Sequence, residues 1–352
     1  MRRLLCLLAT ASLLPAQQPE PAQTTIRATV DVVLVPTTVL DKSGHHVNGL
    51  KPGEFRLTDN DKPQVITEDI GFLPLSLVIC VQANYDTDTI LPKVKKIGPV
   101  LRDLMVGQDG EVSILSFDHR IQKLVDFTND LDKINAGLEK LRPGSSSSRL
   151  KDATLEATRM LRNKKDRRKV ILLIAETRDN SSEVSIQEVA TTLQMWNIDV
   201  YTVNMSTWIA KLTTKPAYPR PDPIPTTART MPGAAAKDPT TVAQMTAAPG
   251  EAMDMYPVFK EVYMGVVGLF THNPAEAFTR MTGGKEFNFM TQADLEKALN
   301  TIGDDLHSQY LLSYNPNNKL EGGYHAIKVA VMRPGLKVRT RPGYWMAARP
   351  EQ

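Results

Sequence analysis

Three short apolar segments, the first two of which are followed by a polar loop, constrain the fold of this chain more than any other feature. They are LPLSLVICV at 73–81, KVILLIAE at 169–176 and IDVYTVNM at 198–205. Continuous apolar runs of this length are typical of strands that are covered on both faces. Helical patterns separate them, and alternating strands and helices imply a mostly parallel sheet with helices on both sides. We therefore predict a doubly wound α/β fold.

Helical periodicity fills most of the intervals between these strands. Apolar residues with helical spacing over 90–105 predict a helical stripe. A serine of the SSSS run at 145–148 is well placed to cap the helix that follows it. Two further strands are expected on either side of a polar turn at Asp118 and His119. The other predicted helices lie at 130–141, 185–196, 273–284 and 291–309.

Both ends of the chain have a different pattern. Residues 24–72 and 308–345 are rich in β-branched residues and in turn signals, with a hairpin expected through DNDKP at 59–63. Neither end has helices to cover its strands. We expect the two ends to pack together as a β-sandwich-like unit that flanks the α/β domain, with strand contacts between VDVVLVPTTV (30–39) and YHAIKVAVM (324–332).

The domain limits follow from these patterns. Residues 1–16 combine a positive start with an apolar stretch too short to span a bilayer, which predicts a signal peptide and a secreted or periplasmic protein. The α/β domain is expected at 73–307. Within it, residues 209–258 are rich in Pro, Thr and Ala, and we interpret them as a flexible insertion. After cleavage a single cysteine, Cys80, remains, so no internal disulfide is expected. No later segment approaches the apolar length of a membrane helix.

Composition and motifs argue against several classes of function. A net charge of +3 without an aromatic-interleaved basic patch does not indicate nucleic-acid binding. Neither a GxGxxG motif nor a P-loop follows the first strand of the α/β domain, so nucleotide binding is not indicated. The serines at 145–148 have no histidine near them in the sequence, and Cys80 should be buried and inert. A carboxylate pair formed by Asp86 and Glu176 is the remaining enzymatic alternative; we predict a non-enzymatic protein.

Three polar segments should meet at the carboxyl edge of the predicted sheet, where doubly wound folds place their ligands. They are VQANYDTD (81–88), SSSSRLKD (145–152) and AETRDNSS (175–182). The order of elements and these segments resemble the von Willebrand factor A-type domain. That resemblance implies a Rossmann-like fold and a site that binds a divalent ion through a DxSxS motif, a threonine and an aspartate.

The residues at these positions depart from the family pattern. The DxSxS motif is replaced by Gln82-x-Asn84-x-Asp86, the threonine by Ser148 and the aspartate by Glu176. Hard divalent ions prefer oxygen ligands, best when anionic. Under the resemblance, Asn84, Asp86, Ser148 and Glu176 are the candidate ligands of a degenerate site, and the metal of that alternative is Mg²⁺ or Mn²⁺.

Segments outside the three loops extend the resemblance to most of the chain that follows the signal peptide, except 209–258. They are similar to a subfamily of secreted A-domain-related proteins common in acidobacteria. The segments concerned are VNGLKPGEFRLTDNDKPQ, FTNDLDKINAGLEKLRPG, RKVILLIAETRDNSS, MTGGKEF, LHSQYLLSYNP and GLKVRTRPGYW.

By analogy with the family, we expect a secreted protein-interaction or adhesion module that binds an unidentified protein partner at the carboxyl edge, without a cofactor. Gln82, Asn84, Asp86, Arg149 and Arg178 would form a polar, partly basic rim that takes an acidic partner directly. The alternatives are metal-dependent adhesion through the modified site, or a structural subunit of an envelope assembly.

Overall fold

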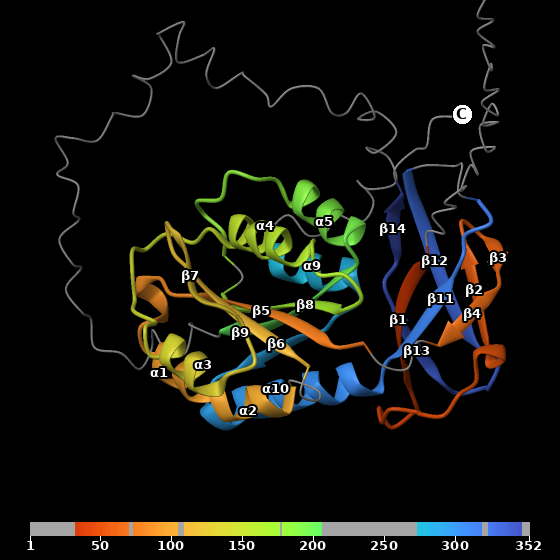
Figure 1. Ribbon diagram of the computed structural model, residues 1–352, viewed down its shortest axis with the longest axis horizontal. Coiled ribbons are helices and arrows are strands. Elements are labelled where there is room, and N and C mark those ends of the chain that lie inside the picture. The colour runs from red at the N-terminus through yellow and green to blue at the C-terminus, as the bar shows by residue number, and fades with distance from the viewer. Residues whose placement is uncertain are drawn as a thin grey trace, which may run out of the picture. The chain divides into compact units, whose positions relative to one another are not determined.

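The computed structural model describes residues 32–69, 73–104, 109–176, 178–205, 273–318 and 323–346 (Figure 1). They belong to one compact unit that begins at Val32. The predicted signal peptide at 1–16 and the predicted insertion at 209–258 lie outside the described residues.

A six-stranded sheet forms the centre of the α/β part, in the order β10-β9-β8-β5-β6-β7. Neighbouring strands run parallel except β6 and β7, which form an antiparallel hairpin. The mostly parallel, doubly wound sheet predicted from the apolar runs is therefore confirmed. The strands are β5 (Leu75–Gln82), β6 (Glu111–Phe117), β7 (Ile121–Thr128), β8 (Arg168–Ala175), β9 (Ile198–Met205) and β10 (Glu286–Phe289).

Helices cover both faces of this sheet (Figure 1). Alternate side chains of β5 enter two separate cores: Leu77 and Ile79 pack with α1, α2, α3 and α10, whereas Val78 and Cys80 pack with α4, α5 and α9. Burial on both sides explains why β5 is apolar along its whole length. The helices are α1 (Leu91–Val94), α2 (Gly98–Leu104), α3 (Leu131–Leu138), α4 (Leu150–Leu161), α5 (Ile186–Met195), α9 (Pro274–Thr282) and α10 (Gln292–Ser308).

The helical stripe predicted over 90–105 is present in the described residues, but it is divided among three helical segments. The structure has the short helix α1, a 3-10 turn η3 (Lys95–Ile97) and then α2. Pro99 has no backbone N–H to donate to the carbonyl of Lys95, so an uninterrupted α-helix would lack a hydrogen bond at this point. The apolar stripe survives the break, because Leu91, Val94, Ile97 and Leu101 are all buried.

The two ends of the described chain form two four-stranded antiparallel sheets, in the orders β13-β1-β11-β4 and β14-β12-β2-β3. Side chains of both sheets share one apolar core, so the predicted β-sandwich-like unit is present. The first sheet contains β1 (Val33–Leu40), β4 (Ile66–Asp69), β11 (Tyr310–Tyr314) and β13 (Lys337–Thr340). The second contains β2 (Phe55–Asp59), β3 (Lys62–Gln64), β12 (Gly323–Val331) and β14 (Gly343–Met346). A 3-10 turn η1 (Pro52–Glu54) leads into β2.

The contacts expected between the segments 30–39 and 324–332 are made across the core of the sandwich by their described residues and not by strand pairing. β1 pairs with β11 and β13, while β12 pairs with β2 and β14. The two segments lie in opposite sheets, and their apolar side chains, such as Val35 and Ile327, share the core between the sheets. The predicted hairpin at 54–72 is confirmed: Asn60 and Asp61 connect β2 to β3 with positive φ angles of 48° and 60°, which these two residue types tolerate.

A fully buried carboxylate, Asp59, organises the polar part of the sandwich core. Its Oδ2 accepts hydrogen bonds from the hydroxyls of Tyr314 at 2.7 Å and Tyr344 at 2.8 Å. Its Oδ1 lies 2.7 Å from Nδ1 of His325 and accepts a hydrogen bond from Asn318 at 3.1 Å. Burial alone would raise the pKa of Asp59, but these donors outweigh it and lower the pKa to about 2.

A second buried carboxylate, Asp305 of α10, bonds to the sandwich and to the central sheet. Its oxygens accept hydrogen bonds from Tyr201 of β9 at 2.6 Å and from Thr38 of β1 at 3.1 Å. Arg339 of β13 forms an ion pair with it, and His46 lies 3.3 Å away. Burial would raise the pKa of Asp305, but Arg339 and the hydroxyl of Tyr201 keep it below its ordinary value.

Among the described helices, none combines the length and the apolar character needed to cross a membrane.

Candidate binding site at the carboxyl edge of the central sheet

Four segments meet at the carboxyl edge: the loop after β5 (82–90), the β6–β7 turn (118–120), the loop before α4 (144–149) and the loop after β8 (178–184). We call them the carboxyl-edge loops. Backbone hydrogen bonds tie them together. Gly144 N–H donates to the carbonyl of Ala83 at 2.7 Å, and Tyr85 N–H donates to the carbonyl of Ser145 at 2.9 Å. The fold thus brings together the three polar segments that the sequence placed at this edge.

Gln82 stands at the end of β5 and is completely buried. Its side-chain oxygen accepts a hydrogen bond from the backbone N–H of Glu176 at 2.8 Å, which joins the ends of β5 and β8. Its amide nitrogen Nε2 has no hydrogen-bond partner within the part of the chain that the structure describes. The unpaired amide nitrogen of Gln82 can therefore offer an N–H donor to its site.

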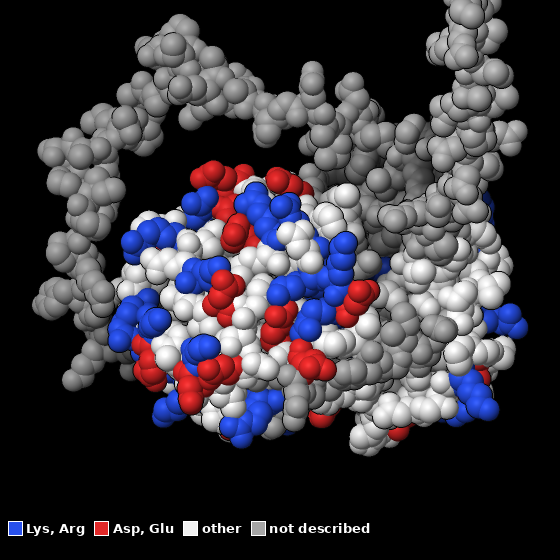
Figure 2. Space-filling model, in the orientation of Figure 1, with Lys and Arg blue, Asp and Glu red and all other residues white. Residues whose placement is uncertain are grey.

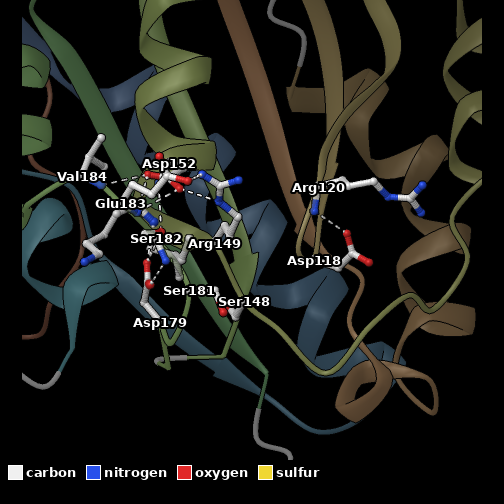
Figure 3. A network of polar contacts seen from close by, with 12 residues as sticks. Asp118, Arg120, Ser148, Arg149, Asp152, Asp179, Ser181, Ser182, Glu183 and Val184 are labelled. Atoms are coloured by element: carbon white, nitrogen blue, oxygen red, sulfur yellow. Dashed lines mark hydrogen bonds and ion pairs between the residues drawn. The ribbon is translucent and has the colours of Figure 1, made fainter. Parts of the chain in front are cut away.

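Two more buried polar atoms in these loops lack hydrogen-bond partners among the described residues. They are Oδ1 of Asn84 and Oγ of Ser148. Both residues are only 2% exposed. The backbone of Ser148 is held firmly, since its N–H donates to Oδ1 of Asn180 at 2.8 Å and its carbonyl accepts from the N–H groups of Asn180 and Ser181. Figure 3 shows Ser148 beside Ser181 at this edge. Native proteins pair most buried polar groups with protein atoms or ordered water, so this loop cluster has three polar atoms to which a water molecule or a ligand can bind.

The donor set matches the ligands that a hard divalent cation prefers only in part, because Oδ1 of Asn84 and Oγ of Ser148 are oxygens whereas the unpaired atom of Gln82 is an amide nitrogen. Such an ion takes oxygen ligands, and an amide N–H group cannot coordinate it. Gln82 has this N–H group at the end of β5. Within the described residues no group of three or more His, Cys, Asp or Glu side chains is placed to hold a metal ion. Asp86, in the 3-10 turn η2 (Tyr85–Thr87), is half-buried, and Glu176 is buried directly after β8.

Arg149 lies at the rim with its charge already paired. Its guanidinium donates to Asp152 at 2.6 Å and to Glu183 at 2.9 Å (Figure 3). The hydrogen bond to Asp152 is the main cause of a raised pKa of Arg149. Arg178, in contrast, is exposed on the loop after β8. Of the two arginines that the sequence placed at the rim, Arg178 is therefore the one whose side chain faces solvent.

The N-terminus of α4 is capped by another loop, so the expected serine cap was wrong. Arg149 occupies the N-cap position and makes no side-chain capping bond. Asp179 accepts a hydrogen bond from the backbone N–H of Lys151 at 2.8 Å, and Ser182 accepts one from that of Asp152 at 3.2 Å. These bonds satisfy N–H groups of the first helical turn, which have no partner within the helix, and they hold the loop after β8 against α4.

Sequence reasoning missed a contact between the β6–β7 turn and the serine loop. Nδ1 of His119 lies 2.9 Å from Oδ2 of Asp118 and 2.9 Å from Oγ of Ser145. The serine run therefore does have a histidine beside it, although none is near in the sequence. Gly144 permits this approach, because a Cβ at that position would lie 2.0 Å from Oδ2 of Asp118. In the sequence, Gly144 after Pro143 indicates only the end of the preceding helix.

Asp118 holds this arrangement in place. Its Oδ1 accepts a hydrogen bond from the N–H of Arg120 at 2.8 Å (Figure 3), and its Oδ2 accepts one from the N–H of Ser145 at 2.9 Å. Burial would raise the pKa of Asp118, but these backbone donors and His119 bring it below its ordinary value. Asp118 is therefore an anion that fixes both the turn and the histidine ring.

The three residues do not form a nucleophile and base relay. In such a relay one ring nitrogen receives the serine proton while the other donates to the carboxylate. Here Asp118 and Ser145 both contact Nδ1 of His119. A nitrogen that donates its proton to Asp118 cannot also accept the proton of Ser145.

The observed order of strands and helices defines a class, a doubly wound α/β fold with flanking antiparallel sheets. Residues 88–178 match the family model described as von Willebrand factor type A domain. Proteins of this family often mediate protein–protein interactions. The match runs from the loop after β5 to the loop after β8, and the mostly parallel sheet is consistent with the fold of that family.

Several solved structures are similar to this chain. BatB from Bacteroides thetaiotaomicron is 13% identical over 65% of this chain and 98% of its own, with a TM-score of 0.39. An aerotolerance-related membrane protein from Bacteroides fragilis NCTC 9343 is 13% identical over the same shares, with a TM-score of 0.37. The SpRpn10 VWA domain is 11% identical over 39% of this chain and 79% of its own, with a TM-score of 0.32. Among curated proteins, none matches the chain.

Proposed function

We propose that this chain is a protein-interaction module whose carboxyl-edge loops bind a carboxylate of a partner protein directly, without a bridging metal ion. The module occupies 73–307, and the segments 24–72 and 308–345 form the unit that flanks it. The observation that carries the proposal is Gln82, whose oxygen accepts a hydrogen bond from the N–H of Glu176 and whose buried amide N–H group has no partner among the described residues.

Two of the three unpaired atoms favour an acceptor as ligand, whereas the third, Oδ1 of Asn84, is itself an acceptor and takes a donor. The amide of Gln82 can only donate at its free end, and the hydroxyl of Ser148 can donate as well. A buried donor without an acceptor costs about 1–3 kcal/mol, which a bound acceptor recovers. Carboxylates are the strongest acceptors that a protein partner offers, because hydrogen bonds to an ionised group are stronger than those between neutral groups.

The carboxyl-edge loops carry charges of both signs, with Asp86, Asp88, Asp118, Asp179 and Glu183 beside Arg120, Arg149 and Arg178. Figure 2 shows Lys and Arg side chains interspersed with Asp and Glu over the face drawn there. A mixed surface gives weak long-range attraction for anions. Recognition must then come from the buried donors, which supports a specific contact over general adsorption of acidic molecules.

Replacing Gln82 by aspartate should disfavour a carboxylate ligand and favour a cation at the same loops. The aspartate removes the N–H donor and places an anion at the position where the A-type family carries one. We expect calorimetry in EDTA to show that the wild-type protein binds a capped hexaglutamate peptide. The Gln82→Asp variant should bind this peptide at least about tenfold more weakly, a loss of about 1.4 kcal/mol. In a separate titration without chelator, Mg²⁺ and Mn²⁺ should give no saturable heat with the wild type.

The matched control is Gln122→Asp, which adds the same charge at an exposed position of β7. It should leave peptide binding unchanged. Saturable Mn²⁺ binding by the wild type that an Asp86→Ala, Glu176→Ala double variant loses would overturn the proposal in favour of a metal-bridged contact. Absence of peptide binding in the wild type would overturn it as well.

We also propose that the protein is exported. The support is the pattern of residues 1–16, a positive start followed by an apolar stretch that ends in small residues. Cells that express the full sequence should release a form whose N-terminus lies near Ala16 into the periplasm or the medium, as N-terminal sequencing would show. Recovery of the uncleaved chain from the cytoplasm alone would contradict export.

A further inference from the structure

We propose that the carboxyl-edge loops recognise a partner segment in which the acidic residue has basic residues next to it in sequence. The carboxylate would reach the donors of Gln82 and Ser148, and a neighbouring lysine or arginine would reach the loop after β5. This inference rests on the proposed function of the same loops and adds the chemistry of the partner.

The unpaired oxygen of Asn84 gives the first reason, because it requires a donor. Oδ1 of Asn84 is buried and has no hydrogen-bond partner among the described residues. A carboxylate only accepts hydrogen bonds, so it satisfies the amide N–H group of Gln82 but not this oxygen. A ligand that pairs both atoms therefore carries a donor beside its carboxylate. The ammonium of lysine and the guanidinium of arginine are side-chain groups that only donate.

The charge of the loop after β5 favours a cationic donor over a neutral one. Residues 82–90 contain Asp86 and Asp88 and no Lys, Arg or His. Asp88 is exposed and forms no ion pair with any residue that the structure describes. The four carboxyl-edge loops together have five acidic and three basic residues, a net charge of −2 with histidine neutral. Like charges across an interface oppose binding, so a basic residue in the partner offsets the repulsion of its carboxylate.

The fold separates this acidic loop from the loops that follow β7 and β8. The loop after β5 leads into α1, whose apolar side chains pack on one face of the central sheet. The loops at 144–149 and 178–184 lead into α4 and α5, which pack on the opposite face. Gln82 ends β5 between them. A ligand held at Gln82 can therefore extend to either side of the sheet edge.

On the side of α4 and α5 the acidic residues already have partners. Asp179 accepts a hydrogen bond from the first turn of α4, and Glu183 forms an ion pair with Arg149. The exposed Arg178 adds a positive charge to this side. The loop after β5 is therefore the side of the edge that favours a cation, and the basic residue of the partner is expected there.

The test is calorimetry in EDTA, at neutral pH and low salt, with three capped hexapeptides whose remaining positions are serine. One has a single glutamate, one has a glutamate between two lysines, and one has the two lysines alone. The wild type should bind the lysine–glutamate peptide about fivefold or more tightly than the single-glutamate peptide. The peptide with lysines alone should bind at least about tenfold more weakly than the lysine–glutamate peptide, since it lacks the carboxylate.

Two variants identify the loop that holds the basic residue. Asp88→Asn removes an exposed charge and should lower the advantage of the lysine–glutamate peptide over the single-glutamate peptide by about twofold or more. Asn84→Asp has acceptor oxygens only and adds a charge, so it should increase the same advantage. The matched control is Asp304→Asn, at an exposed position of α10, which should leave the advantage unchanged.

Three results would overturn this inference and leave the proposed function intact. They are equal binding of the lysine–glutamate and single-glutamate peptides, equal binding of the peptide with lysines alone, and an advantage that neither Asp88→Asn nor Asn84→Asp alters. Failure of the wild type to bind hexaglutamate would instead overturn the proposed function, because hexaglutamate tests the carboxylate contact without any lysine.

Discussion

Replacement of Asp305 by alanine is expected to lower the free energy of unfolding by about 3–5 kcal/mol, the usual loss when one partner of a buried charge pair is removed. The variant leaves Arg339 without its carboxylate and leaves the hydroxyls of Tyr201 and Thr38 without their acceptor. These partners belong to β13, β9 and β1, so one substitution weakens contacts between the central sheet, α10 and the sandwich.

The measurement is urea denaturation followed by circular dichroism at neutral pH. Asp304→Ala is the matched control, because Asp304 is the preceding residue of the same helix and is exposed. That variant should change stability by less than about 0.5 kcal/mol. A loss below about 1 kcal/mol for Asp305→Ala would contradict the proposed role of the carboxylate. A separate unfolding transition for the sandwich would show that Asp305 couples two cooperative units.

Replacement of Asp59 by alanine should cost a similar amount, about 3–5 kcal/mol, because four buried donors lose a common acceptor. The donors are the hydroxyls of Tyr314 and Tyr344, the ring of His325 and the side-chain amide of Asn318. The same denaturation experiment measures this loss. Asp61→Asn is the control, since Asp61 is exposed, follows Asp59 by two residues and occupies a positive φ angle that asparagine also tolerates.

Asp59 should also make stability depend on acid. Its pKa is about 2 in the folded protein, below the ordinary value of 3.8. The folded state therefore binds this proton less readily than the unfolded state does. The resulting stabilisation is fully present above about pH 4 and is lost as pH falls toward about 2, with a total near 2 kcal/mol. Asp59→Asn has no such titration, so the stability difference between wild type and this variant should shrink over that interval. A constant difference would contradict the role assigned to the ionised carboxylate.

The strands of the central sheet could be predicted because their burial on both faces leaves a direct mark on the sequence. Val78 and Ile79 point to opposite cores and are both apolar, which a half-exposed strand would not allow. The hairpin at Asn60 and Asp61 was predictable for a local reason, the backbone angles that these residues accept. The strand pairing within the sandwich was not predictable. Both β1 and β12 carry the alternating pattern, which does not specify whether two strands pair in one sheet or face each other across the core.

The site was predictable in place but not in detail. Gln82 and Glu176 stand at the ends of apolar strands, and Ser148 comes just before a helix. These positions placed all three residues at the carboxyl edge. Residue types alone do not say which end of the Gln82 amide is already bonded. That depends on the backbone N–H of Glu176, which belongs to another strand. The contact of His119 with Ser145 likewise depends on how a hairpin turn and a distant loop meet.

The closure of the sandwich by both ends of the described chain has a consequence for biosynthesis. Val33 of β1 pairs with Tyr314 of β11, and Leu57 of β2 pairs with Val329 of β12. Partners so far apart in sequence form late, because a long loop must close first. As the chain emerges from the ribosome, β5, β6, β8 and β9 can assemble while β1 and β2 still present bare strand edges. A nascent chain that stops before β11 would carry those edges exposed, in the state most prone to aggregation.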